Sequence, residues 1–256
     1  MPVGDLTRQA VHRADGVAQL RAPGYRWVST GHPGGLRTAD AAYNISVPEG
    51  FNRTDLRSYI DTRRARAGFV ADGFALLTGV DMRHARLART AETTVIATAG
   101  VSNPAVLPPP GTPAPVRSGS PRGGTVNLLI SVDGQLTDAA LFNLIAVAAE
   151  AKAATLLRST AAPGTSSDAI IIGCAPRGAS VRFSGSVTPV GAAVRACVRD
   201  AIAASLRSRY GSGPPPHGGD AAHGSTTSVR PTVAPLRLMD PPDGDGPSPP
   251  TTVPPP

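Results

Sequence analysis

The stretch from Gly123 to Ala175 constrains the fold of this chain more than any other. An apolar run ends near Val132, and mostly apolar residues then extend from about Asp138 to Arg158. A turn of small residues follows, and it leads through Asp168 into Ile170–Ile172. This order predicts strand, turn, helix, turn and strand, with the helix covered on both sides because it is apolar on nearly every face.

Three polar residues interrupt the predicted helix: Asn143, Glu150 and Lys152, the only lysine in the chain. At 100° per residue, Asn143 and Glu150 share a face, while Lys152 points roughly opposite to Glu150. A buried carboxylate has to be hydrogen-bonded, paired with a cation or shifted in pKa. These residues are therefore candidates for chemistry. The structural alternative is that Glu150 only binds loop N–H groups and that Lys152 lies along the surface.

The two ends of the chain differ from its middle in composition. The last 46 residues, 211–256, contain 13 of the 27 prolines and no periodic apolar pattern, which predicts a disordered tail. Residues 1–24 form an N-terminal segment with little pattern, and residues 25–210 are long enough for one buried core. Within this domain, residues 107–122 are rich in Pro, Gly and Ser, which predicts a loop that acts either as a lid or as a tolerated insertion.

The other segments of the domain alternate between strands and helices. Strands are predicted near residues 25–30, 41–47, 74–80, 93–98 and 180–187, and helices near residues 54–67 and 192–209. With the central unit, six or seven strands alternate with three or four helices. We therefore expect a single α/β domain with a mixed β-sheet and helices packed over it.

Charge and cysteine content bear on partners and compartment. The formal net charge is +7, but the arginines are scattered and no aromatic residues interleave them, so we expect no nucleic-acid partner; a basic nucleic-acid-associated protein stays as an alternative. Cys174 and Cys197 lie in apolar surroundings, which predicts reduced core residues in a cytoplasmic protein. No signal-peptide pattern and no run of 18 apolar residues occurs, so we expect no membrane partner.

The motifs of common nucleotide, serine-hydrolase and metal chemistries are missing from the sequence, and the five histidines are dispersed. What remains is a set of acidic, amide and hydroxyl side chains that suits amide hydrolysis. That reaction needs a base to activate water, donors for the oxyanion and an acid for the leaving amine. Glu150 or Asp168 could be the base, and Lys152, Asn127 or the backbone of the 164–167 turn could be the donors.

A covalent route through a hydroxyl group stays open beside the water route, with Thr125, Thr165 or Ser166 as the nucleophile. The glycine-rich turn at residues 31–35 permits close backbone approach to a ligand, although an ordinary tight turn has the same composition. Asn44, in the middle of a predicted strand, either tethers a loop or contacts an amide of the substrate.

Several of these segments, in the same order along the chain, resemble the adenosylcobinamide amidohydrolase (CbiZ-type) family. The resemblance covers roughly residues 25–206. The segments that carry it are Ser29-Thr30-Gly31-His32-Pro33-Gly34-Gly35, Asn44-Ile45-Ser46-Val47-Pro48, Ala97-Thr98-Ala99-Gly100-Val101-Ser102-Asn103, Gly124-Thr125-Val126-Asn127, Ala149-Glu150-Ala151-Lys152, Gly164-Thr165-Ser166-Ser167-Asp168 and Phe183-Ser184-Gly185-Ser186-Val187-Thr188-Pro189-Val190-Gly191.

The resemblance implies hydrolysis of the amide that joins the aminopropanol arm of adenosylcobinamide to its corrin ring, which yields adenosylcobyric acid in cobalamin salvage. The partner would be this small corrinoid, and cobalt would arrive inside the substrate, with no protein-bound metal or other cofactor. It favours Glu150, Asp168 and Lys152 as a catalytic group without assigning a role to any one of them. Our own hypothesis is that Glu150 is the base and that Asp168 orients the 164–167 turn. The expected substrate-binding residues are Gly34, Gly35, Asn44, Asn103, Thr125, Asn127, Gly164 and Thr165.

Two positions depart from the family pattern. Ala149 stands where the family usually has Thr, and Ser166-Ser167 stands where it has Gly-Thr. Both changes remove or exchange small polar groups near the expected site. The alternative hypothesis is therefore a non-catalytic corrinoid-binding protein of the same fold.

Overall fold

The computed structural model describes residues 9–117, 124–212 and 226–229. Its three α-helices are α1 (Leu56–Arg66), α2 (Asp138–Ser159) and α3 (Pro189–Tyr210), and a short 3-10 helix spans Met82–His84. The strands are β1 (Ala10–Ala14), β2 (Val17–Ser29), β3 (Gly35–Ser46), β4 (Gly73–Thr78), β5 (Arg86–Arg89), β6 (Thr93–Ala99), β7 (Ala114–Arg117), β8 (Val126–Val132), β9 (Gln135–Leu136), β10 (Ala169–Cys174), β11 (Ser180–Val181) and β12 (Thr226–Val229).

One large mixed sheet organises the molecule, as the sequence predicted. Its order is β4-β3-β2-β10-β8-β6-β5, and β1 pairs with β2 at the side. The pairs β8–β10 and β3–β4 are parallel, whereas β2–β3, β2–β10, β6–β8 and β5–β6 are antiparallel. The prediction of an α/β domain with a mixed sheet is therefore confirmed.

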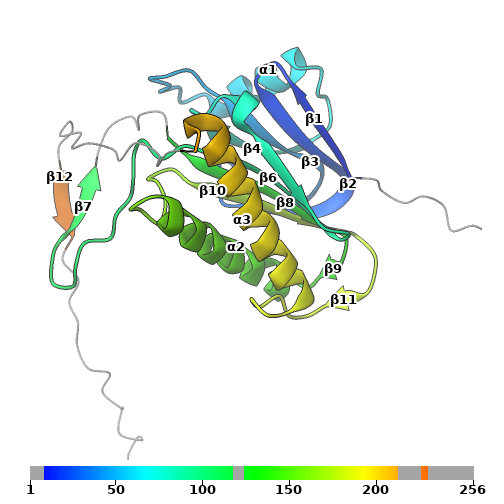
Figure 1. Ribbon diagram of the computed structural model, residues 1–256. Helices are drawn as coiled ribbons and strands as arrows, with labels where there is room; N and C mark the ends of the chain where they lie inside the picture. Colours follow the sequence, from blue (N-terminus) through cyan, green and yellow to red (C-terminus); the bar gives the residue numbers. More distant parts are fainter. Residues whose placement is uncertain (1–8, 118–123, 213–225, 230–256) are drawn as a thin grey trace, which may run out of the picture.

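The helices α2 and α3 lie side by side across one face of this sheet (Figure 1). Thr137 caps α2 by accepting a hydrogen bond from the N–H of Ala140 at 3.2 Å. A first core cluster joins the two helices to alternate residues of β6, β8 and β10, including the fully buried Leu128 and Ile172. By length and composition α2 could span a membrane, but eight of its residues are buried on the sheet.

The sheet curls so that β3 and β4 lie over the face of β8 and β10 that points away from α2 and α3. A second core cluster fills this fold with residues of β2, β3, β4, β6, β8 and β10 and contains no helical residue. Trp27 is its largest member and is completely buried. A third cluster packs α1 through Ile60 against the outer side of β3 and β4.

Several elements begin or end at other residues in the structure than the sequence predicted. β2 runs from Val17 to Ser29 and crosses the boundary placed at residue 24, because β1 and β2 form a hairpin of the main sheet. The predicted strand at residues 180–187 is wrong beyond Val181, since the rest is a loop that leads to α3. The helix predicted near residues 54–67 begins at Leu56, after Asp55, which makes no side-chain cap.

The predicted loop and tail lie partly outside the described residues, at 118–122, 213–225 and 230–256. Their described parts contain two strands that the sequence did not predict. β7, within the loop, pairs antiparallel with β12, within the tail.

The close packing of β10 on β2 provides a test of the curled core. Gly173 lies opposite Trp27, and a Cβ atom at residue 173 would lie 2.5 Å from the indole Cε3. We expect Gly173→Ala to cost about 1–3 kcal/mol, because overpacking a tight core forces side chains from their rotamers. Thermal unfolding should show a melting temperature lower by roughly 2–4 °C for each kcal/mol.

Gly185→Ala is the matched control, because nothing lies within 4 Å of its Cβ position. Its melting temperature should stay close to wild type. Equal stability of both variants would contradict the packing described for Trp27.

Candidate active site

Three loops meet at one end of the sheet because of the strand directions. The parallel strands β8 and β10 start at this end, and the antiparallel β6 finishes there, with Ala99 opposite Val126. The loops that follow β6 and precede β8 and β10 are therefore neighbours. An isolated bridge joins Pro104 to Thr165, and the side-chain amide of Asn103 donates to the Ser166 hydroxyl at 2.8 Å.

The Asp168 carboxylate is the centre of this cluster. Its Oδ1 accepts hydrogen bonds from the backbone N–H of Val126, at 2.8 Å, and from the Thr165 hydroxyl. Its Oδ2 accepts from the backbone N–H of Thr165, at 3.0 Å, and from the Lys152 ammonium. One side chain thus ties the loop before β10 to the start of β8 and to the helix α2.

Lys152 reaches Asp168 from the sheet-facing side of α2. The Lys152 side chain is 13 % exposed and that of Asp168 is 9 % exposed. Gly164 makes this approach possible, because a Cβ atom there would lie 2.6 Å from Asp168 Oδ2 and 2.8 Å from Lys152 Nζ. Two charges this well covered need each other and the additional hydrogen bonds, since an unpaired charge would be costly to bury.

Hydroxyl and glycine positions complete the cluster around the start of β8. The hydroxyls of Thr125 and Ser167 lie 2.9 Å apart. Gly124 touches the loop after β6, where a Cβ atom would lie 2.6 Å from the backbone nitrogen of Ser102 and 2.7 Å from Asn103 Oδ1. That oxygen is buried and has no hydrogen-bond partner within the described part of the chain.

Inside the curled sheet, a ladder of polar side chains joins strands that are not neighbours. Asn44 of β3 donates to the hydroxyl of Thr98 on β6 at 2.8 Å. Asn127 of β8 donates to Asn44 Oδ1 and to the carbonyl oxygen of Leu77, each at 2.9 Å. Asn44, Thr98 and Asn127 are completely buried. The ladder holds β3 and β4 over β6 and β8, and Asn127 Oδ1 is left without a partner among the described residues.

The glycine-rich turn after β2 adjoins the same end. The N–H of Thr30 donates to the carbonyl of Ile170 at 3.0 Å, and the N–H of Ile170 donates to the Thr30 hydroxyl at 2.9 Å. These bonds fix the turn two residues from Asp168. Gly34 and Gly35 are exposed at its surface, and β3 starts at Gly35.

Glu150 lies apart from this cluster. Its side chain is 59 % exposed on the outer side of α2, where it accepts from Arg195 at 3.0 Å and from Ser186 at 3.2 Å. The prediction that Glu150 is covered is wrong, because α3 covers only one flank of this part of α2. The structure therefore brings together Asp168, Lys152 and the amide, hydroxyl and glycine residues, but not Glu150.

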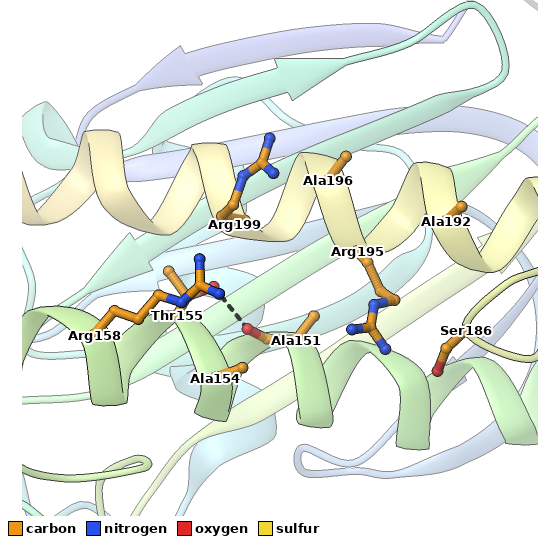
Figure 2. A pocket seen from close by; sticks show the side chains of 9 residues that line it. All are labelled: Ala151, Ala154, Thr155, Arg158, Ser186, Ala192, Arg195, Ala196 and Arg199. Carbon is orange, nitrogen blue, oxygen red and sulfur yellow. Dashed lines mark hydrogen bonds between the residues drawn. The ribbon is translucent and has the colours of Figure 1, made fainter.

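A groove of about 310 Å³ between α2 and α3 lies on this outer side. Figure 2 shows Arg158, Arg195 and Arg199 around a floor of small residues that includes Ala151 and Ala154. None of the residues that converge on Asp168 lines it. The Asp168 cluster, where several polar groups converge, is therefore the candidate active site, and this groove is not.

Comparison with known proteins decides the family. The family model described as adenosylcobinamide amidohydrolase (CbiZ) matches residues 3–214. This chain belongs to the CbiZ family. It is 52% identical over 223 residues to the adenosylcobinamide amidohydrolase of Halobacterium salinarum, covering 86% of this chain and 96% of that protein. It is 29% identical over 192 residues to the protein of the same name from Methanosarcina mazei, covering 71% and 90%.

Two contributors to this CbiZ site were not among the predicted site residues. Thr98 supplies the acceptor for Asn44, and Ser167 contacts Thr125. The alternation of side chains along the strand at residues 93–98 could have placed Thr98 on the same face as Ile96. No local pattern could show that this face meets β3, because the contact depends on how the sheet curls.

The ion pair can be tested by a double-mutant cycle on the free energy of unfolding. Asp168→Asn leaves the ammonium of Lys152 covered and unpaired, so we expect a loss of about 3–5 kcal/mol. Lys152→Met should cost less, because the carboxylate keeps its bonds from Val126 and Thr165. The double variant should lose clearly less than the sum of the single losses in denaturant unfolding. Additive losses would show that the two groups do not interact.

Proposed function

We propose that this protein hydrolyses the amide between the aminopropanol arm and the corrin ring of adenosylcobinamide, yielding adenosylcobyric acid in cobalamin salvage. The family and the names of both relatives support this activity. The structural observation that supports it most is the hydrogen-bonded series Thr165–Asp168–Lys152 at the end of the sheet. It brings a hydroxyl, a carboxylate that can accept its proton and a cation that orients the carboxylate within hydrogen-bond reach of one another.

The geometry favours the covalent route, with Thr165 as the nucleophile. Its hydroxyl already donates to Asp168 Oδ1, and Lys152 with two backbone N–H groups fixes that carboxylate. A nucleophile, a base within hydrogen-bond reach and a third group that orients the base are the usual parts of such a site. Glu150 also contacts a hydroxyl and a cation, those of Ser186 and Arg195, but its side chain is 59 % exposed. The Asp168 side chain is 9 % exposed and is held by two backbone N–H groups, so it is the better positioned of the two carboxylates.

In this mechanism the Thr165 oxygen attacks the carbonyl carbon of the amide while its proton passes to Asp168. The tetrahedral intermediate then expels the amine of aminopropanol, which takes that proton from Asp168. Asp168 then deprotonates a water molecule, whose oxygen attacks the ester carbonyl. The bond to the Thr165 oxygen breaks, this oxygen takes the proton back from Asp168, and the carboxylic acid leaves. Ser166 can stabilise the oxyanion, because it accepts from Asn103 and its own proton remains available.

The two departures from the family pattern do not favour the corrinoid-binding alternative. Ala149 packs against the core between the helices and the sheet, where a methyl group is sufficient. Ser167 keeps a hydroxyl that contacts Thr125, and Ser166 contacts Asn103. Small polar groups therefore remain at the turn.

A cysteine nucleophile does not fit the structure. Burial raises the pKa of both the Cys174 and the Cys197 thiol, which keeps them in the unreactive protonated form. Both are free and buried, and we propose a reducing, cytoplasmic location on that basis. The corrinoid is the partner that we propose, with no role for nucleic acid or a membrane.

The nucleophile can be tested at residue 165. Thr165→Val keeps the volume of the side chain and removes the hydroxyl, so we expect turnover of adenosylcobinamide to fall by at least about 10²-fold. Thr165→Ser keeps the hydroxyl and should retain most of the turnover. Glu150→Gln is the matched control on the outer side of α2 and should remain near wild type. Products are quantified by mass spectrometry.

The opposite pattern of activities would assign the reaction to a different residue. If Thr165→Val remains active while Glu150→Gln is inactive, Glu150 is the base and Thr165 only holds the loop. If all three variants match wild type, neither residue carries the reaction.

We further propose that hydrolysis requires no protein-bound metal. Within the described ranges no group of three or more His, Cys, Asp or Glu side chains is placed to hold an ion. Turnover should therefore be unchanged after dialysis against a chelator. Activity that is lost on dialysis and restored by zinc would overturn this proposal, because metal binding would then be part of the active state.

A further inference from the structure

A second hollow lies beside the glycine-rich turn, outside the Asp168 cluster. It has a volume of about 640 Å³, within the range of roughly 300–1,000 Å³ that is usual for ligand sites. Its walls come from His32 on one side and from the start of α1 on the other. The residues on the α1 side are Thr54, Asp55, Leu56, Arg57, Ser58, Asp61 and Thr62.

The turn holds His32 in a defined place. A Cβ atom at Gly31 would collide with the side chain of Leu76, and one at Gly34 would lie 2.9 Å from the carbonyl oxygen of Gly31. The turn is therefore packed tightly against β4 and against itself. Only its outer part, with the exposed His32, projects from the sheet.

The imidazole of His32 differs from the other histidines of the described residues. His84 is hydrogen-bonded to Ser208, and His12 packs near the ring of Phe69. His32 makes no hydrogen bond or ring contact within the described part of the chain, so both of its nitrogens are available to a ligand. A neutral imidazole is the commonest metal ligand among protein side chains.

The opposite wall offers hydrogen bonds and an apolar surface. The hydroxyls of Thr54 and Ser58 have no partner within the described part of the chain. The first N–H groups of α1 are also available, because Asp55 makes no side-chain cap and instead pairs with Arg53. Leu56 adds an apolar contact. Such a wall suits a flat ring with amide groups at its edge.

The hollow is connected to the proposed chemistry through the backbone. Thr30, two residues before His32, is bonded in both directions to Ile170, two residues after Asp168. The turn that carries His32 and the loop that carries Thr165 and Asp168 are therefore neighbours at this end of the sheet. This is what hydrolysis of an amide on a side chain of the ring requires.

We propose that His32 binds the cobalt of the corrinoid substrate as an axial ligand, within the hollow between the glycine-rich turn and α1. The inference rests on the proposed function for the identity of the substrate. The adenosyl group occupies one axial position of cobalt, so a nitrogen of His32 takes the opposite one. A cobalt–nitrogen bond forms, bound water leaves, and no electron is transferred.

Electron paramagnetic resonance tests this bond directly. The probe is cob(II)inamide, added anaerobically to the full-length protein. Binding through His32 should split each cobalt line into a triplet, because one nitrogen-14 nucleus becomes an axial ligand. His32→Gln should lose this triplet. His12→Gln is the matched control and should keep it.

Each outcome decides the inference. A wild-type spectrum without nitrogen splitting, or a triplet that persists in His32→Gln, overturns it. The melting temperature of His32→Gln, an exposed substitution, shows that a lost triplet does not come from unfolding. Amide cleavage is measured separately by mass spectrometry. A triplet without cleavage would reject the proposed function and keep the ligand, whereas cleavage without a triplet would do the reverse.

Discussion

The contact between Lys152 and Asp168 is the interaction on which the rest of the site depends. It connects the helix α2, the loop before β10 and the start of β8, three segments that are separate in the sequence. A covered ion pair stabilises a protein only when its remaining hydrogen-bonding capacity is also satisfied. Asp168 meets this condition with Val126 and Thr165, and Gly164 leaves the space in which the two charges meet. The same bonds that satisfy the charge also fix the Thr165 hydroxyl.

A second constraint is the curl of the sheet. Asn44, Thr98 and Asn127 are completely buried, so each has to find partners inside the protein. They find them mainly in one another, across strands that do not pair. This ladder fixes how β3 and β4 cover β8, and so it determines where the turn after β2 stands relative to Asp168. Asn44 and Asn127, which the sequence suggested as substrate contacts, thus stabilise the fold through this ladder.

Much of the architecture could be predicted from local patterns. The strand, helix and strand around α2 are each marked by a run of apolar residues, and Thr137 is a good N-cap for the helix. Less predictable was the burial of single residues on α2. Glu150 and Lys152 differ in exposure because α3 and the loop before β10 cover different flanks of the helix, and the helical period alone cannot say which flank is covered. The N-terminal hairpin of β1 and β2 was missed although its pairing is local, with Ala14 opposite Val17, because residues 1–24 show little apolar pattern. The short β11 shows the reverse, a strand-like composition that finds only β9 to pair with.

The position of the site follows from strand direction. In open parallel sheets, ligands usually bind beyond the carboxyl ends of the strands. Here the cluster lies at the amino ends of the parallel pair β8 and β10, and the antiparallel strands β2 and β6 bring their carboxyl ends to the same edge. The helices α2 and α3 also end there, since Tyr210 contacts Val101. Helix carboxyl ends carry partial negative charge, which disfavours phosphate and favours cations. The ammonium of Lys152, which meets Asp168 at this edge, agrees with that field.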